Sequence, residues 1–405
     1  QGSGANVTIP TGKTKMIYSD GAGSGGAMVD ALASINIETS GILETSASIQ
    51  TPLIEFTDGD DAMTIADGGH VTFGGNIDAS SGTIKLDGNY PTGSNNVALG
   101  NAALDDGSLS GDNNTAIGST ALSANTTGNR GAALGTSALA ANTTGTENVG
   151  IGYQSLDANT TGAANTAVGS EALGANTTAN FNTAVGTAAM IANTTGANGT
   201  AVGGLALDAN TTGANNTAVG KSSLSANTTG TQNTAVGTGA LDANTTANNN
   251  NAFGYDALGA NTTGALNSAF GEESLLANTT GSSNTAIGSA ALTANTTASN
   301  NTAVGRLALA ANTTGEKNTA VGANAADAIT TGTANTSIGL ESLTTLTTGS
   351  NNTAVGEQAL ADSTTSSNNT AVGRKALKEN STGDDNTAVG REALLENTTA
   401  SGNVA

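Results

Sequence analysis

The chain of 405 residues contains no cysteine and no tryptophan, only three prolines and a single histidine. The absence of cysteine excludes disulfide bonds, cysteine-based metal sites and cysteine nucleophiles. Lysine and arginine number 11 against 32 aspartates and glutamates, so the net charge is −21. Because phosphate recognition requires clustered basic side chains, this charge argues against a nucleic-acid partner. No apolar run approaches the length of a membrane span, and we expect no membrane insertion.

Aromatic residues are also scarce, and they make up 2% of the chain. A polar composition with few aromatics can indicate disorder. Disordered segments, however, do not keep an apolar residue at a fixed phase, and this chain does so from Leu99 onward. We therefore expect an ordered protein.

The order comes from a seventeen-residue repeat with the consensus NTAVGxxALxANTTGxx, which runs from Asn114 to the end of the chain. An earlier copy at Gly100 is offset by 18 residues. A strict period predicts a stacked structure in which each repeat forms one coil. We number the positions of a coil from the Asn of the NTAVG pentad. The pentad glycine, position 5, recurs without insertion or deletion at Gly118, Gly135, Gly152, Gly169 and onward to Gly390.

Each part of the coil has its own pattern. Positions 2 to 4 (Thr-Ala-Val) favour a strand, and the glycine at position 5 allows a turn with positive φ. Positions 8 and 9 (Ala-Leu) form a second apolar element, for which strand and single helical turn both stay open. Asn-Thr-Thr-Gly at positions 12 to 15 predicts a polar turn. Positions 6, 7, 10, 16 and 17 vary, hold nearly all the charges and are expected to face water.

The apolar residues at positions 4 and 9 are the predicted core of the stack. The representative core residues are Ile117, Leu122, Val168, Leu173, Val219 and Leu224. Two such side chains per coil make a thin core. We therefore expect three identical chains to pack around an axis, and the alanines at positions 3, 8 and 11 to provide the surface on which they meet.

Position 12 is predicted to point inward by an exchange of residue types. One coil has Ala326 at position 9, where Leu or Met is usual, and the same coil has Ile329 in place of Asn at position 12. The next coil has Leu346 at position 12. An apolar group lost at one position is thus replaced at another, although drift at an exposed turn is the alternative. If position 12 is inside, its amides should form a buried hydrogen-bonded ladder. The predicted ladder begins with Asn125, Asn142, Asn159 and Asn176.

These patterns predict an all-β fold, a repetitive β-solenoid or β-roll that forms a homotrimeric fibre. Residues 1–33 are predicted to form a small N-terminal β domain on the attachment side, and residues 34–94 a β-rich neck. Residues 95–405 form an array of about eighteen repeats. Segments 15–18 and 34–38 have strand patterns, and only residues 27–32 could form a short helix. Because the chain begins with Gln1 and stops inside a pentad, we expect the natural protein to continue beyond both ends.

The pentad strand, glycine turn and small-residue coil resemble the left-handed parallel β-roll of trimeric autotransporter adhesin heads, whose repeats are shorter. The array is also similar to tail-fibre and related virion proteins of bacteriophages, especially marine ones. In those proteins it follows segments much like VTIPTGKTKMIYSDG (7–21), TPLIEFTDGDDAMTIADGGHVTFGG (51–75) and GTIKLDGNYPTG (82–93). The resemblance covers most of the chain. It implies an extracellular, homotrimeric virion fibre that attaches to other virion proteins at its N-terminal end and reaches a host receptor through a distal tip beyond residue 405.

Catalytic and metal-binding patterns are weak. His70 is the only candidate for a Ser-His-Asp triad and has no supporting motif. Asp58, Asp60 and Asp61 form an acidic cluster without the spacing or the bidentate Glu of an EF-hand. We expect no metal, no cofactor and no enzymatic activity.

The function expected from the sequence is that of a structural phage fibre, which acts as a rigid spacer. The alternative is a bacterial trimeric surface adhesin or an extracellular filament subunit on the cell surface. A more remote alternative is an ice-binding β-solenoid, because Thr recurs at positions 13 and 14. Adjacent residues of a strand point to opposite sides, which argues against a flat threonine face built from these two positions.

Overall fold

The computed structural model describes residues 17–19, 28–30 and 93–405. The chain separates into two compact units, residues 1–82 and 83–405. In the first unit, β1 (Ile17–Ser19) pairs antiparallel with β2 (Met28–Asp30). β1 overlaps the strand expected at 15–18. β2 lies where the sequence allowed a short helix, because pairing with β1 holds this segment extended. The other segments expected before residue 93, and the expected boundary between residues 33 and 34, lie outside the described residues.

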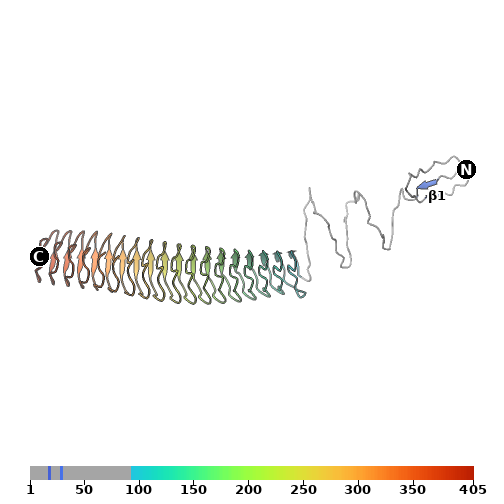
Figure 1. Ribbon diagram of the computed structural model, residues 1–405, viewed down its shortest axis with the longest axis horizontal. Helices are drawn as coiled ribbons and strands as arrows, with labels where there is room; N and C mark the ends of the chain where they lie inside the picture. The colour runs from blue at the N-terminus through green and yellow to red at the C-terminus, as the bar shows by residue number, and fades with distance from the viewer. Residues whose placement is uncertain (1–16, 20–27, 31–92) are drawn as a thin grey trace. The chain divides into compact units, whose positions relative to one another are not determined.

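The second unit is a ladder of three-residue parallel strands that follow one another in chain order (Figure 1). Each strand occupies positions 2 to 4 of one coil, and residues 93–405 contain no helix. Successive strands pair at an offset of 17 residues, as in Thr166↔Thr183, except that β3 pairs with β4 at an offset of 18, in Val97↔Thr115. The predicted all-β solenoid of 17-residue coils is confirmed. Its strands are β3 (Val97–Leu99), β4 (Thr115–Ile117), β5 (Ala132–Leu134), β6 (Val149–Ile151), β7 (Thr166–Val168), β8 (Thr183–Val185), β9 (Thr200–Val202), β10 (Thr217–Val219), β11 (Thr234–Val236), β12 (Asn251–Phe253), β13 (Ser268–Phe270), β14 (Thr285–Ile287), β15 (Thr302–Val304), β16 (Thr319–Val321), β17 (Thr336–Ile338), β18 (Thr353–Val355), β19 (Thr370–Val372) and β20 (Thr387–Val389).

A glycine turns the chain at the end of each of these strands. The predicted turn glycines Gly118, Gly135, Gly152 and Gly169 have φ angles of 134°, 141°, 131° and 137°. A Cβ atom on Gly118 would lie 2.4 Å from the carbonyl oxygen of Gly135 in the next coil. Position 5 therefore requires glycine for two reasons, the positive φ and the close approach of neighbouring backbones.

Positions 8 and 9 form neither a strand nor a helical turn. Thr120 at position 7 and Leu122 at position 9 both have positive φ, 57° and 51°, and this alternation recurs along the array. The N–H of Leu122 donates to the carbonyl oxygen of Ala138 in the next coil, at 3.0 Å. Left-handed backbone disfavours β-branched side chains most strongly, and the half-buried Thr120 is the single β-branched residue among the positive-φ residues of the described ranges. In agreement, position 9 holds only Leu, Met190 or Ala326, although Thr is abundant in the repeats and Val or Ile is usual at position 4.

The core of the second unit lies inside the coils, at positions 3, 8 and 9. Ala116, Ala121 and Leu122 are buried in one coil, and their equivalents are buried along the array. The prediction is confirmed for the leucines of position 9, among them Leu173 and Leu224, which have no exposed surface.

The prediction was wrong for position 4. The side chains of Ile117 and Val219 are 37% and 36% exposed, and Val168 is half-buried. Alternation along a strand places positions 2 and 4 on one side and position 3 on the other. The space at position 3 admits little more than a methyl group. At Gly150, for example, an added Cβ would already lie 3.1 Å from the Ser155 hydroxyl oxygen. Alanine therefore takes the inner side, and valine is left outside.

The same geometry overturns the expected contact surface between chains. The alanines of positions 3 and 8 are buried within their own coil and cannot meet a second chain, as Ala218 and Ala240 illustrate. Those of position 11 are only partly exposed. The side of the strand that faces away from the core consists instead of positions 2 and 4.

Candidate functional site

A column of asparagines runs through the interior at position 12, as predicted. The side-chain amide of Asn142 donates to Oδ1 of Asn125 at 3.0 Å, and Asn159 and Asn176 continue the chain of bonds at 2.8 Å each. All four side chains are buried. Each amide also donates to the carbonyl three residues ahead, as Asn142 does to Gly145 at 3.1 Å. The column therefore joins consecutive coils and closes the turn at positions 12 to 15 within each coil.

The column is interrupted where the sequence exchanges residue types. Ile329 and Leu346 are buried at position 12, and Ala326 is buried at position 9. The predicted inward exchange is confirmed. The interruption leaves Oδ1 of Asn312 buried without a hydrogen-bond partner, because the next coil offers no amide. An unpaired buried acceptor is destabilising, so this junction is a weak point of the stack.

A second buried column, at position 1, was not predicted. The backbone N–H of Asn165 donates to Oδ1 of Asn148 at 3.0 Å, and the amide of Asn148 donates to the carbonyl of Gly162 at 2.7 Å. The available signal was the recurrence of Asn at the first place of the pentad. Gly131 and Gly199 are the exceptions at position 1 of the repeats that begin at Asn114, and a Cβ on Gly199 would lie 2.6 Å from Cε of Met190.

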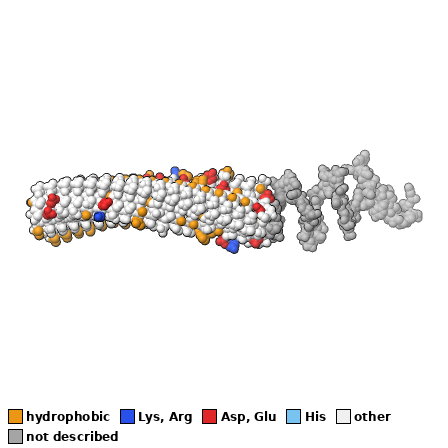
Figure 2. Space-filling model, turned by 90° about the horizontal axis from the view of Figure 1, so that it is seen from below, with side chains coloured by type: hydrophobic (Ala, Val, Ile, Leu, Met, Phe, Trp, Pro, Cys, Tyr) orange, Lys and Arg blue, Asp and Glu red, His pale blue; other side chains and the backbone are white. Residues whose placement is uncertain are grey.

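The outward side of the β3–β20 ladder carries the side chains of positions 2 and 4, and we call it the outer face. No residue at these two positions is charged. Position 4 is a row of Leu, Ile, Val and Phe that reaches 47% exposure at Leu134 and 62% at Val389. The rings of Phe253 and Phe270 stack on each other in this row, with centroids 4.7 Å apart. In Figure 2, uncharged polar atoms and backbone predominate on the side of the array that is seen, and charged side chains are few.

Charged side chains lie mainly on the turns and form ion pairs between neighbouring coils. Arg130 pairs with Glu147, and Lys378 with Asp362 at 2.9 Å. Burial raises the pKa of the Asp157 and Asp208 carboxyls at position 10 above its usual range. Oδ1 of Asp208 is buried without a hydrogen-bond partner. Asp157 and Asp208 lie three coils apart, and the neighbouring carboxylates of Glu171 and Asp242 contribute, less than burial does, to their raised pKa values.

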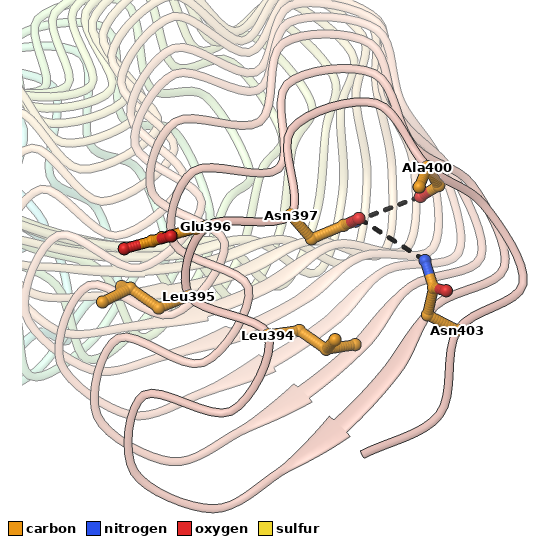
Figure 3. A pocket seen from close by; sticks show the side chains of 6 residues that line it. All are labelled: Leu394, Leu395, Glu396, Asn397, Ala400 and Asn403. Atoms are coloured by element: carbon orange, nitrogen blue, oxygen red, sulfur yellow. Dashed lines mark hydrogen bonds between the residues drawn. The ribbon is translucent and has the colours of Figure 1, made fainter.

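One hollow lies at the last coil, where Leu394, Leu395, Glu396, Asn397, Ala400 and Asn403 surround it (Figure 3). The amide of Asn397 donates to the carbonyl of Ala400 at 3.0 Å, and Asn403 reaches Oδ1 of Asn397 at 3.4 Å. These residues occupy positions that the following coil covers elsewhere in the array. The hollow is the uncovered interior of a coil and shows no separate ligand chemistry.

Over residues 17–19, 28–30 and 93–405, no three His, Cys, Asp or Glu side chains gather closely enough to hold a metal ion. In the same described ranges there is no helix with the length and hydrophobicity of a membrane span. His70 and the cluster of Asp58, Asp60 and Asp61 lie outside these ranges.

The fold and its columns define the second unit as a parallel β-solenoid of 17-residue coils. Comparisons of the chain with protein-family models, with curated proteins and with solved structures found no match.

Proposed function

We propose that the repeat array is a rigid spacer in an extracellular homotrimeric fibre. The observation that carries this proposal is the uninterrupted ladder from β3 to β20, in which each strand pairs only with its neighbours in the sequence. A stack of this kind grows in one direction by a fixed step per coil. Length is then the property that the sequence specifies, and the number of repeats sets the distance between the ends of the array.

The interior columns support a mechanical role. Buried amides bonded from coil to coil resist sliding and bending, because a displaced coil would leave several polar groups unpaired at once. Ladder bonds along all sides of the coil add to this, for example Thr126 N–H to the Thr143 carbonyl at 2.9 Å. The polar residues of the array form hydrogen bonds between stacked coils and do not gather into a binding site.

The type of particle is proposed from the resemblance of residues 7–21, 51–75 and 82–93 to phage fibre proteins. In this proposal the N-terminal end binds other virion proteins, and a distal tip of the fibre binds the host receptor. A bacterial surface adhesin uses the same spacer on a different particle. Immunogold labelling with an antibody to the array separates the two, since it marks virion appendages in the first case and the bacterial envelope in the second.

The spacer proposal is tested by electron microscopy of the purified chain and of a variant that lacks residues 182–283, which are six complete coils. At about 4.8 Å per coil, the native array should be a rod of roughly 85 Å and the variant should be shorter by about 29 Å. The deletion should leave the melting temperature nearly unchanged. A matched variant that lacks residues 182–275 breaks the period and should misfold at the junction. Equal lengths for the native chain and the six-coil deletion would contradict the proposal.

A further inference from the structure

The outer face, formed by positions 2 and 4, is the one long surface of the array that combines exposed apolar side chains with a lack of charge. Its apolar row includes Leu134, Ile151, Val219, Phe270 and Ile338, all of which are at least 36% exposed. An exposed apolar strip that runs through 18 strands exceeds the scattered apolar residues of an ordinary soluble surface. Such a strip indicates an interaction surface.

The distribution of charge favours a copy of the same chain as the molecule that covers the outer face. With a net charge of −21, two copies repel each other wherever their turns approach. The outer face is free of charge at both of its positions from Val97 to Val389, so copies can meet there without burying carboxylates. A partner that covers the whole strip must also be as long as the array and must repeat at the same step, and a second copy has both properties.

The size of the face is sufficient for stable association. Three extended residues span about 10 Å, and 18 strands at about 4.8 Å span roughly 82 Å. The face therefore offers on the order of 800 Å² per copy, which is the contribution of one partner to an interface of standard size.

Two strands of the face change together. From β7 to β20, position 2 is Thr in every strand except β12 and β13, which have Asn251 and Ser268. The same two strands are the only ones with an aromatic residue at position 4, the stacked pair Phe253 and Phe270. A joint change at both outward positions is expected if the two larger rings must fit against a facing surface.

We propose that copies of this chain pack on one another through the outer face, side by side and in the same direction, with Phe253 and Phe270 of each copy at the same level. This inference rests on the homotrimer of the proposed function and names the surface that forms it. Equivalent faces around an axis must point the same way. In that arrangement the rings meet rings and the valines meet valines, whereas antiparallel copies would set each ring against a valine.

The first test measures the mass of the full chain and of the double variant V202K/V219K by mass photometry. The native chain should be a trimer, and the double variant should be a monomer with an unchanged β-sheet circular dichroism spectrum, because both residues face away from the core. The control L205K/L266K changes two exposed leucines of the turns and should remain trimeric. A trimeric V202K/V219K would overturn the proposed surface and leave the fibre proposal intact. A native monomer would overturn both the trimer and the surface, while the rod length would still test the spacer.

The second test follows the aromatic pair with F253W, which introduces the only tryptophan of the chain. Its emission should be blue-shifted and protected from acrylamide in the trimer, and both properties should be lost in the V202K/V219K background. The control F181W, at a side chain that is 67% exposed, should be accessible in both states. Equal quenching of the two tryptophans in the trimer would overturn the assignment.

Direction is tested by cross-linking, since the chain has no native thiol. T370C lies in β19 and T115C in β4, near opposite ends of the ladder. A short bis-maleimide should link T370C chains to one another, and a mixture of T370C and T115C chains should give no mixed product. Mixed products without T370C self-linkage would show antiparallel copies. A monomeric chain that displays thermal hysteresis would assign the regular Thr-x-Val face to ice and overturn the proposal.

Discussion

The two sides of the ladder β3–β20 differ in role, because residues on the inner side determine how the coil folds and residues on the outer side are available for association. On the inner side, position 3 lies against position 8 of its own coil and position 9 of the preceding coil, as Gly150 does against Ser155 and Leu139, and it is fully buried, as at Ala218. On the outer side, Val219, the next residue in the chain, is more than one-third exposed. The smaller apolar residue is therefore the one that folding depends on. The larger one is available for association. Hydrophobicity alone would have placed the valine, rather than the alanine, in the core.

Charge at these two neighbouring residues should separate the roles most strongly. Ala218→Asp buries a carboxylate with no partner and should lower the free energy of unfolding by more than about 3 kcal/mol. Val219→Asp should lower it by less than about 1 kcal/mol, and it should weaken association instead. Denaturant unfolding at concentrations where the chain is monomeric measures both. Equal losses would mean that the inner and outer sides are wrongly assigned.

The next largest effect is expected for substitutions at position 9, where the buried leucine has a left-handed backbone conformation. Leu224→Val places a β-branched side chain at a φ of 51° in a buried site, and it should cost about 2–3 kcal/mol from backbone strain and lost packing. Leu224→Met keeps an unbranched side chain and should cost less than about 1.5 kcal/mol. If valine and methionine were tolerated equally, the left-handed backbone could not be the reason for their unequal use at position 9.

A smaller effect tests the exchange inside one coil. Ile329→Asn supplies an amide to Oδ1 of Asn312 but leaves a void beside Ala326, whereas Ala326→Leu overfills the interior beside Ile329. The double variant restores the consensus at both positions. A double-mutant cycle should give a favourable coupling of about 1–3 kcal/mol. Additive effects would show that positions 9 and 12 do not share one space.

The smallest expected effect concerns Asp208, whose pKa burial raises. The folded chain then binds a proton more tightly than the unfolded chain, so stability falls as the pH rises from the usual aspartate range through the raised pKa. Asp208→Asn should remove this dependence and raise the melting temperature slightly at neutral pH. The exposed Glu316→Gln serves as the control and should change neither. A steeper loss of stability with rising pH in Asp208→Asn would contradict the sign of this effect.

Those features that recur from repeat to repeat could be predicted from the sequence. The period, the turn glycines, the core leucines such as Leu122 and the buried column that starts at Asn125 are all readable from recurrence. The exchange of Ala326 and Ile329 showed which way position 12 points. Recurrence alone does not say whether a residue faces inward, and for this reason the column at position 1 was missed.

The orientation of the strand could not be predicted in the same way. Three residues allow either side to face the core, and the choice depends on how closely the coil walls approach. The turns at positions 5, 7 and 9 set that distance. The sequence of a single repeat gives no sign that Leu122 has a left-handed backbone conformation. The absence of β-branched residues from position 9 across all repeats was the only available signal.

The most direct measurement is a cryo-electron microscopy map of the purified chain in which the coils and their larger side chains are resolved. We expect one coil of 17 residues per step of about 4.8 Å, with the leucines and both asparagine columns inside and the row from Leu134 to Ile338 outside its own coil. A map in which the valines fill the coil and the alanines lie outside, or in which successive steps do not correspond to 17 residues, would contradict it.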